Sequence, residues 1–168
     1  SAYVDPNGWI TEITDEIDAK TCYGHDPMGR LTSIVFPSET QTGVCDASRW
    51  SPIYISFQQI NTPDRGLPAG HWRRMQMQGN RHTYAYMDAL WRPVMELDFD
   101  ISDNVTWNTQ TQVIKRYDVS GRLAFQSYPT RHVGDFNQSL PGTRTFYDAL
   151  DRVTRVEQDS EHGILATT

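Results

Sequence analysis

The sequence predicts an all-β protein in which successive antiparallel β-hairpins form a curved, twisted sheet. The first observation is a set of short alternating runs, rich in β-branched and aromatic side chains, at 83–86 and 113–117. The second is that turn residues interrupt the chain every few positions, which favours short strands joined by hairpins. The best helix candidate, Thr14–Lys20, spans barely two turns.

A third observation is a motif that recurs along the chain: Tyr, Asp, two free residues, Gly, Arg and an aliphatic residue, often followed by Thr. It is clear in residues 1–37 and 84–168, within one repeat region that covers 1–168. Its Asp residues are 21, 62, 30 and 30 positions apart, so the long gap predicts degenerate repeats or an insertion at 38–83. The motif residues are Tyr3, Asp5 and Gly8; Tyr23, Asp26, Gly29 and Arg30; Tyr86, Asp88 and Arg92; Tyr117, Asp118, Gly121 and Arg122; and Tyr147, Asp148 and Arg152.

Each motif position has a physical role in a hairpin. Asp is favoured at the first position of a type I turn, where its carboxylate accepts a backbone N–H. Gly three residues later sits where φ is positive and closes the hairpin through a bulge. The Tyr and the aliphatic residue then fall on the two strands of one hairpin. The Arg pairs with an acidic neighbour or stacks on an aromatic ring.

Two repeats lack Gly at the positive-φ position. Asp151 replaces it in the last repeat, and Asp tolerates the left-handed region. Trp91 replaces it in the third repeat, where a bulky residue is costly. Either the turn there has a different type, or Trp91 is strained.

One more hairpin is predicted outside the motif, around the dipeptide Gly79-Asn80. Pairing about this turn places Met75 and Met77 on the same face as Tyr84 and Tyr86. Because that face is apolar, we expect it to point inward.

The composition disfavours two classes of partner. The net charge is −6, whereas nucleic-acid binding depends on neutralising phosphates. The run His71–Arg74 mixes basic and aromatic residues as single-strand binders do, but the net acidity and the alternation after it argue against that interpretation. No apolar run is long enough to span a bilayer, and no signal-peptide pattern starts the chain. Since the first residue is Ser, we expect the chain to have been cut from a longer protein or cleaved from a tag.

The two cysteines, Cys22 and Cys45, do not make a disulfide framework, and no CxxC motif is present. A single disulfide between them is possible. We expect instead two reduced, partly buried thiols, which fit synthesis in a reducing compartment.

No catalytic, cofactor or metal site is predicted. The histidines show neither HExxH nor HxH spacing, and Asp98, Asp100 and Asp103 lack the Gly and the distal Glu of a calcium loop. We therefore expect a solvated acidic loop at 98–103. Gly-rich phosphate loops and GxSxG motifs are absent from the sequence. The five histidines are His25, His71, His82, His132 and His162.

The recurring Tyr-Asp-x-x-Gly-Arg-Leu-Thr pattern resembles the RHS family, also called YD repeats. The stretch Gly66–Arg74, with Asp88–Pro93 after it, looks like the large bacterial RHS proteins. The resemblance implies hairpins that coil into a hollow β-shell around a cytotoxic C-terminal domain, in toxins that are made in the bacterial cytoplasm and exported, often by type VI secretion. Implied partners are the remainder of the parent protein, both shell and toxin domain, with secretion-system components or a chaperone.

Asp26-Pro27-Met28-Gly29-Arg30 partly matches the Asp-Pro-x-Gly-Leu self-cleavage motif that ends RHS cores. Its last residue is Arg rather than Leu, and it coincides with a repeat turn, so we expect a structural role. The resulting hypothesis is a non-enzymatic shell segment, with open strand edges that favour self-association. The alternative is a carbohydrate- or cell-surface-binding β module, in which exposed Tyr and Trp stack on sugar rings.

Overall fold

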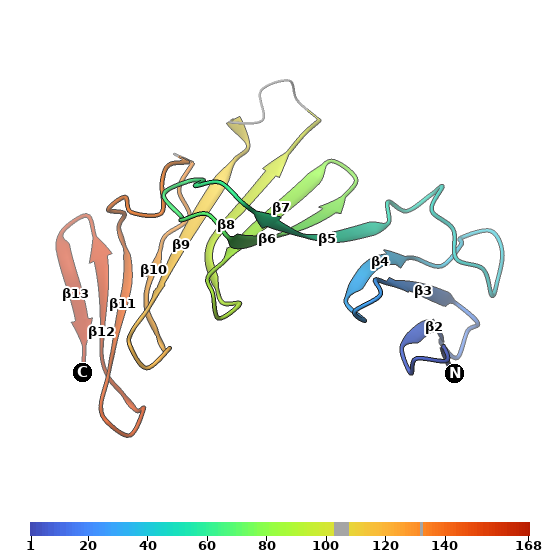
Figure 1. Cartoon of the computed structure of the whole chain (residues 1–168), viewed down its shortest axis with the longest axis horizontal. Helices are drawn as coiled ribbons and strands as arrows, with labels where there is room; N and C mark the ends of the chain where they lie inside the picture. Colours follow the sequence, from blue (N-terminus) through green and yellow to red (C-terminus); the bar gives the residue numbers. More distant parts are fainter. Residues whose placement is uncertain (103–107, 132) are drawn as a thin grey trace. The chain divides into compact units, whose positions relative to one another are not determined.

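The computed structural model describes residues 1–102, 108–131 and 133–168. The described residues form thirteen strands and no α-helix, and each strand hydrogen-bonds its neighbours in chain order in one open sheet (Figure 1). The predicted all-β class of successive antiparallel hairpins is confirmed. The strands are β1 (Ala2–Val4), β2 (Ile10–Thr14), β3 (Lys20–His25), β4 (Leu31–Val35), β5 (Ile53–Ile60), β6 (His71–Gln78), β7 (Arg81–Met87), β8 (Pro93–Asp100), β9 (Thr111–Tyr117), β10 (Leu123–Ser127), β11 (Gly142–Tyr147), β12 (Val153–Ser160) and β13 (Gly163–Thr167).

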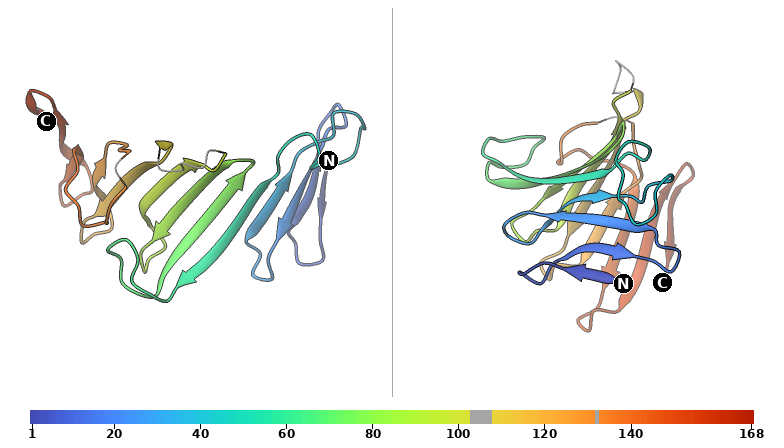
Figure 2. Two further views of the ribbon diagram at one scale, coloured as in Figure 1. Left: turned by 90° about the horizontal axis from the view of Figure 1, so that it is seen from above. Right: turned by 90° about the vertical axis from the view of Figure 1, so that its right-hand side faces the viewer.

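The chain divides into two compact units, and each is described by itself. The N-terminal unit comprises residues 1–57 and 74–82, and the C-terminal unit comprises 58–73 and 83–168. In both units, consecutive strands lie side by side (Figure 2). Among the described residues, every fully buried apolar side chain belongs to the C-terminal unit, so that unit holds the packed core.

In the N-terminal unit, a disulfide joins Cys22 of β3 to Cys45, with their Cα atoms 6.1 Å apart. The expectation of two reduced thiols is therefore wrong. The chain leaves β4, doubles back, and pairs Pro37 with Cys45 in an isolated β-bridge. This return brings Cys45 beside β3, a proximity that two cysteines without a motif do not reveal.

The weak helix candidate at 14–20 forms no helix, because this segment runs from the end of β2 through a turn to the start of β3. Asp15 accepts the backbone N–H groups of Ile17 and Ala19 on Oδ1 at 2.9 and 2.8 Å. Asp18 has a φ of 66°, in the left-handed region. The segment is thus a tight Asp-led turn, since local side-chain-to-backbone bonds outcompete one short helical turn.

Two irregular segments complete the core of the C-terminal unit. Leu67, from the connection between β5 and β6, clusters with Tyr86, Met95 and Ile114, and Phe136 packs against the cluster. The two segments also meet directly, because the backbone N–H of Phe136 donates to the Arg65 carbonyl at 2.8 Å. They therefore supply the apolar cover for this part of the sheet.

A buried glutamine fixes the second of these segments. The side chain of Gln112 on β9 is fully buried, and its Oε1 accepts from the backbone N–H of Gly134 and from Nε2 of Gln138, both at 2.9 Å. Its own Nε2 donates to the Gly134 carbonyl at 3.0 Å. Because every polar atom of this side chain is satisfied, it anchors the connection between β10 and β11 without an unpaired buried group.

The strands expected at 83–86 and 113–117 are confirmed as parts of β7 and β9, and the turn expected at Gly79-Asn80 joins β6 to β7. The long gap between the second and third motifs contains the β5–β6 hairpin, whose connection at 61–70 carries no Tyr-Asp motif. The gap at 38–83 thus holds a hairpin with an irregular connection in place of a motif turn.

Candidate functional site

The motif turn is a network closed by one aspartate, and Asp118 between β9 and β10 shows it fully. Oδ1 accepts the backbone N–H groups of Ser120 and Arg122, both at 2.9 Å. Oδ2 accepts Nε of Arg122 at 2.7 Å. The backbone N–H of Gly121 donates to the Asp118 carbonyl at 2.9 Å, and Gly121 has a φ of 85°. One carboxylate therefore fixes both the turn and the arginine that leaves it.

The backbone part of this network recurs at the other four motif aspartates. Each carboxylate accepts hydrogen bonds from the backbone N–H groups two and four residues later, at Asp5, Asp26, Asp88 and Asp148. In three of these repeats the Nε–H of the motif arginine donates a hydrogen bond to Oδ2 of the aspartate in the same turn. The distances are 2.7 Å for Arg30, 2.8 Å for Arg92 and 2.8 Å for Arg152. In the first repeat Trp9 stands at the arginine position.

The two repeats without Gly keep the same turn. Trp91 and Asp151 have φ values of 60° and 63°, so the turn type is unchanged and Trp91 is the strained residue. Contacts explain both departures. The Trp91 ring stacks on Trp72 at 5.1 Å between centroids. Asp151 Oδ1 accepts Nη1 of Arg122, from the preceding hairpin, at 2.7 Å.

These bonds favour the charged carboxylate. The pKa of Asp118 lies below its ordinary value, chiefly because the backbone N–H of Arg122 donates to it. Burial raises the pKa of Asp88, but the side-chain and backbone bonds from Arg92 outweigh burial, and the net pKa is lowered. The pKa values of Asp5, Asp26 and Asp148 are lowered as well.

The position just before the aspartate faces the aliphatic residue after the turn. Tyr117 pairs with Leu123, and Tyr147 pairs with Val153. A register shift adjoins each pair, as a bulge requires. In the earlier repeats this structural position belongs to Val4, His25 and Met87. The motif tyrosines there lie elsewhere: Tyr3 pairs with Glu12, Tyr23 pairs with Ile34, and Tyr86 is buried in the core.

The arginine of one hairpin meets the tyrosine of the next, and we call this contact the Arg–Tyr junction. The Arg92 guanidinium lies 4.4 Å from the Tyr117 ring centroid, and Tyr117 Oη donates to the Pro93 carbonyl at 3.0 Å. The Arg122 guanidinium lies 4.7 Å from the Tyr147 ring, and Tyr147 Oη donates to the Leu123 carbonyl at 3.0 Å. Each junction thus fixes one hairpin against its successor by stacking and by a hydrogen bond.

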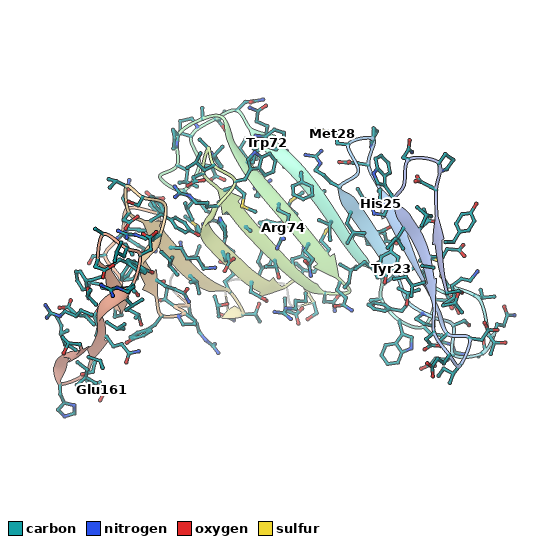
Figure 3. The ribbon with its side chains drawn as sticks, turned by 90° about the horizontal axis from the view of Figure 1, so that it is seen from below. Tyr23, His25, Met28, Trp72, Arg74 and Glu161 are labelled. Carbon is teal, nitrogen blue, oxygen red and sulfur yellow. A yellow bond between two sulfur atoms is a disulfide. The ribbon has the colours of Figure 1, made fainter. Side chains whose placement is uncertain are left out.

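The N-terminal unit has aromatic counterparts of this junction. The Trp9 ring lies 5.7 Å from the His25 ring, so the same two motif positions meet with different side chains. The Arg30 guanidinium lies 4.8 Å from the Phe57 ring. Figure 3 labels Tyr23 and His25 on β3 and Met28 at the tip of the turn that follows.

Arg152 is hydrogen-bonded to Asp148 in its own turn, but among the described residues no aromatic ring stacks on its guanidinium. Its side chain is 74% exposed, against 25% for Arg122 and 28% for Arg92. The partial burial of the junction arginines therefore comes from the next hairpin rather than from the turn itself.

Sequence reasoning placed the turn residues but missed three features of the site. It did not pair Arg92 with Tyr117, it did not place Trp9 against His25, and it did not recognise the Asp15 turn. The constant spacing of the last three motifs was the available signal for the first. The Asp-x-x-Asp pattern at 15–18 was the signal for the third.

The remaining candidate groups do not converge. Within residues 1–102, 108–131 and 133–168, no three His, Cys, Asp or Glu side chains gather closely enough to hold a metal ion. Asp100 accepts the backbone N–H of Ser102 at 2.7 Å, whereas Asp103 and His132 lie outside the described residues. No helix in the described part of the chain has the length and apolar character needed to cross a membrane.

A chain in which successive hairpins share one turn network and one inter-hairpin contact is a β-hairpin repeat protein. The RHS Repeat family model matches residues 4–41, which span the first two motif turns. This stretch of the chain is therefore similar to the RHS family, also called YD repeats. No curated protein matches the chain. RHS-repeat proteins are generally secreted or cell-surface proteins of bacteria.

Proposed function

We propose that this chain is a non-enzymatic structural segment of an RHS-repeat shell that encloses a toxic C-terminal domain in a secreted bacterial toxin. The observation that carries the proposal is the Arg–Tyr junction. Tyr117 and Tyr147 are locked between successive hairpins, with their hydroxyl groups bonded to backbone carbonyls. A tyrosine packed and hydrogen-bonded in this way stabilises the sheet, and its ring is not free to stack on a ligand.

The motif chemistry supports a wall rather than a catalyst. Asp26, in the segment that partly matches a self-cleavage motif, already accepts Nε of Arg30 at 2.7 Å and two backbone N–H groups of its own turn. A catalytic aspartate needs an oxygen that can reach substrate. We therefore assign Asp26 to the turn.

Export from a bacterial cytoplasm is supported by the disulfide between Cys22 and Cys45. Such bonds form and persist in oxidising compartments and are rare in the cytosol. We propose that the protein is made in the cytoplasm, is exported as a toxin by a route such as type VI secretion, and acquires this disulfide afterwards.

The proposed partners are the rest of the parent shell, its toxin domain, and a secretion component or chaperone. The terminal strands β1 and β13 each hydrogen-bond only one neighbouring strand of the described sheet. Open strand edges are templates for pairing. The isolated chain should therefore self-associate, and a single monomeric species over a wide concentration range in analytical ultracentrifugation would contradict this.

The decisive experiment is limited proteolysis of a natural protein that contains this sequence together with its C-terminal region. The shell proposal expects the C-terminal region to resist protease and the intact protein to be non-toxic. Replacing both Tyr117 and Tyr147 by Ala should expose that region. The matched control replaces the exposed Tyr3 and Tyr54, which are 65% and 49% exposed. A C-terminal region that is digested equally fast in the unmodified protein would refute enclosure.

A specific observation favours a second candidate, the carbohydrate-binding module. In the N-terminal unit, Trp50 is 55% exposed and lines a groove of about 370 Å³ with Phe36, Pro37 and the polar Glu39 and Gln78. An exposed indole with polar groups beside it suits a neutral sugar ring. A glycan array would test this. Binding that Trp50→Ala abolishes would support the module, and an array without signal would remove it.

A further inference from the structure

A groove in the C-terminal unit lies beside the first Arg–Tyr junction, and we call it the junction groove. It has a volume of about 540 Å³, within the usual range of small-molecule sites. Its lining comes from the β5–β6 connection, the turn after β7, strands β8 and β9, and Phe136. The lining residues are Leu67, Pro68, Ala69, Gly70, His71, Met87, Asp88, Ala89, Arg92, Val94, Lys115, Arg116, Tyr117 and Phe136.

Most of this lining is apolar. Leu67, Met87 and Val94 belong to the buried core, with 7%, 8% and 5% of their surface exposed. The exposed Ala89 also lines the groove, from the turn that Asp88 closes. An occupant must therefore carry an apolar body, because a fully polar ligand would lose water contacts without replacing them.

The charged lining is unbalanced. Arg92 is paired with Asp88, and Lys115 is paired with Glu96 at 2.9 Å. Arg116 instead donates to the carbonyls of Phe136 and Gln138. Among the described residues no carboxylate pairs with Arg116, so the groove has one cation in excess.

The wall also contains an unused polar atom. Nδ1 of His71 lies 2.7 Å from the Pro68 carbonyl, and since a carbonyl only accepts, Nδ1 carries the proton. The imidazole is 7% exposed, and its Nε2 has no hydrogen-bond partner in the described structure. The chain therefore leaves this one ring nitrogen of His71 without a hydrogen bond in the wall of the groove.

We propose that the junction groove binds an apolar carboxylate, a compound with a hydrocarbon body and one anionic head, such as a medium-chain fatty acid. The body occupies the apolar lining, and the head lies toward Arg116, where it supplies the missing negative charge. An apolar cation would meet the excess positive charge instead. A neutral alcohol would keep only the apolar contribution. This site is independent of the shell proposal, because it requires only the C-terminal unit.

The test compares three ligands with the same eight-carbon chain, octanoate, octanol and octylammonium, by isothermal titration calorimetry on the whole chain. The proposal expects octanoate to bind at least about tenfold more tightly than octylammonium, with octanol between them, a difference of about 1.4 kcal/mol or more. Equal affinity for the three ligands, or no octanoate binding at millimolar concentration, would overturn it.

Two matched variants locate the binding. Ala89 and Val119 are both exposed and both directly follow a motif aspartate, but only Ala89 lines the junction groove. Ala89→Trp should weaken octanoate binding at least about tenfold, whereas Val119→Trp should leave it unchanged. If Ala89→Trp leaves the affinity for octanoate unchanged, the ligand binds outside the junction groove and the proposal is wrong.

Charge is tested at Arg116. Arg116→Lys keeps the cation, and Arg116→Gln removes it. The preference for octanoate over octanol should persist in the first and disappear in the second. Since either change removes bonds to the 136–138 backbone, circular dichroism must first show an intact fold. If neither variant folds, the ligand series and the two tryptophan variants still decide the proposal.

Discussion

The guanidinium of Arg122 lies 4.7 Å from the ring centroid of Tyr147, while Nε of the same arginine is bonded to Asp118 in its own turn. The arginine therefore belongs to two hairpins at once. In its own hairpin Arg122 is bonded to the Asp118 carboxylate, and in the next hairpin the ring of Tyr147 packs against its guanidinium. This relationship links the local turn to the stacking of repeats.

Arg122 and Arg152 provide a natural comparison, because both bond their own aspartate and only Arg122 stacks on the next tyrosine. Arg122→Ala should lower the midpoint of urea unfolding clearly more than Arg152→Ala does, since it also removes the inter-hairpin contact. Equal shifts for the two variants would mean that the junction adds no stability.

The hydroxyl of Tyr117 should contribute through its bond to the Pro93 carbonyl. Tyr117→Phe keeps the ring under Arg92 and removes that bond, so we expect a loss of about 1 kcal/mol in the free energy of unfolding. Tyr3→Phe serves as the control, because Tyr3 is 65% exposed and should show no change. A Tyr117→Phe protein as stable as the unmodified chain would contradict the role assigned to this bond.

Gly29 should tolerate Ala less well than Gly8, although both have positive φ, 80° and 87°. A Cβ at Gly8 meets open space, so Gly8→Ala should cost about 1–2 kcal/mol for the left-handed backbone alone. A Cβ at Gly29 would lie 2.8 Å from the Trp9 ring, so Gly29→Ala should cost more. Adding Trp9→Ala should remove the extra cost, and persistence of that cost would disprove the steric explanation.

Acid should weaken the turns in a defined direction. The pKa of Asp118 is lowered by the backbone and side-chain donors of Arg122, so its stabilising contribution is present above its unfolded pKa of about 4 and is lost as the pH falls through the lower folded value. Asp118→Asn should flatten the fall in the free energy of unfolding below about pH 4. Parallel pH profiles for the two proteins would rule out a contribution from this carboxylate.

The disulfide should stabilise the N-terminal unit. Cys22 and Cys45 are 23 residues apart, and closing a loop of that size contributes about 3 kcal/mol in the chain-entropy estimate. Reducing agent should therefore lower the unfolding midpoint of the unmodified chain and increase hydrogen exchange in residues 36–52. The double variant with Ser at both positions should not respond to the reductant. Identical unfolding with and without reductant would show that the bond is not formed or not stabilising.

Local patterns predicted a large part of this fold. Alternation located β7 and β9, and the Asp-led turns of the five motifs all join consecutive strands. Such features depend on residues only a few positions apart, and their hydrogen bonds form within the turn. The candidate segment Thr14–Lys20 was ambiguous because acidic residues suit a helix start as well as a turn, and the bonds at Asp15 decide for the turn.

The junctions required the tertiary structure. A Tyr-Asp motif predicts where a turn lies and which residues follow it. The register of the following strands decides that Arg92 contacts Tyr117 and that Trp9 contacts His25. The same register shows that Tyr3, Tyr23 and Tyr86 do not occupy the junction position, although the motif groups them with Tyr117 and Tyr147. One-residue differences in spacing change the face on which a strand residue lies.

By itself, the sequence determined that the protein is an all-β hairpin repeat and where its turns lie, because hydrogen bonds over two to four residues and a period-two alternation specify both. Only the tertiary structure decided that Cys22 pairs with Cys45, that two irregular segments cover the core, and that an apolar groove forms beside Arg92 and Arg116. These features bring together residues that are distant in the chain. Packing against neighbouring strands sets their positions, and no local pattern of residues encodes that packing.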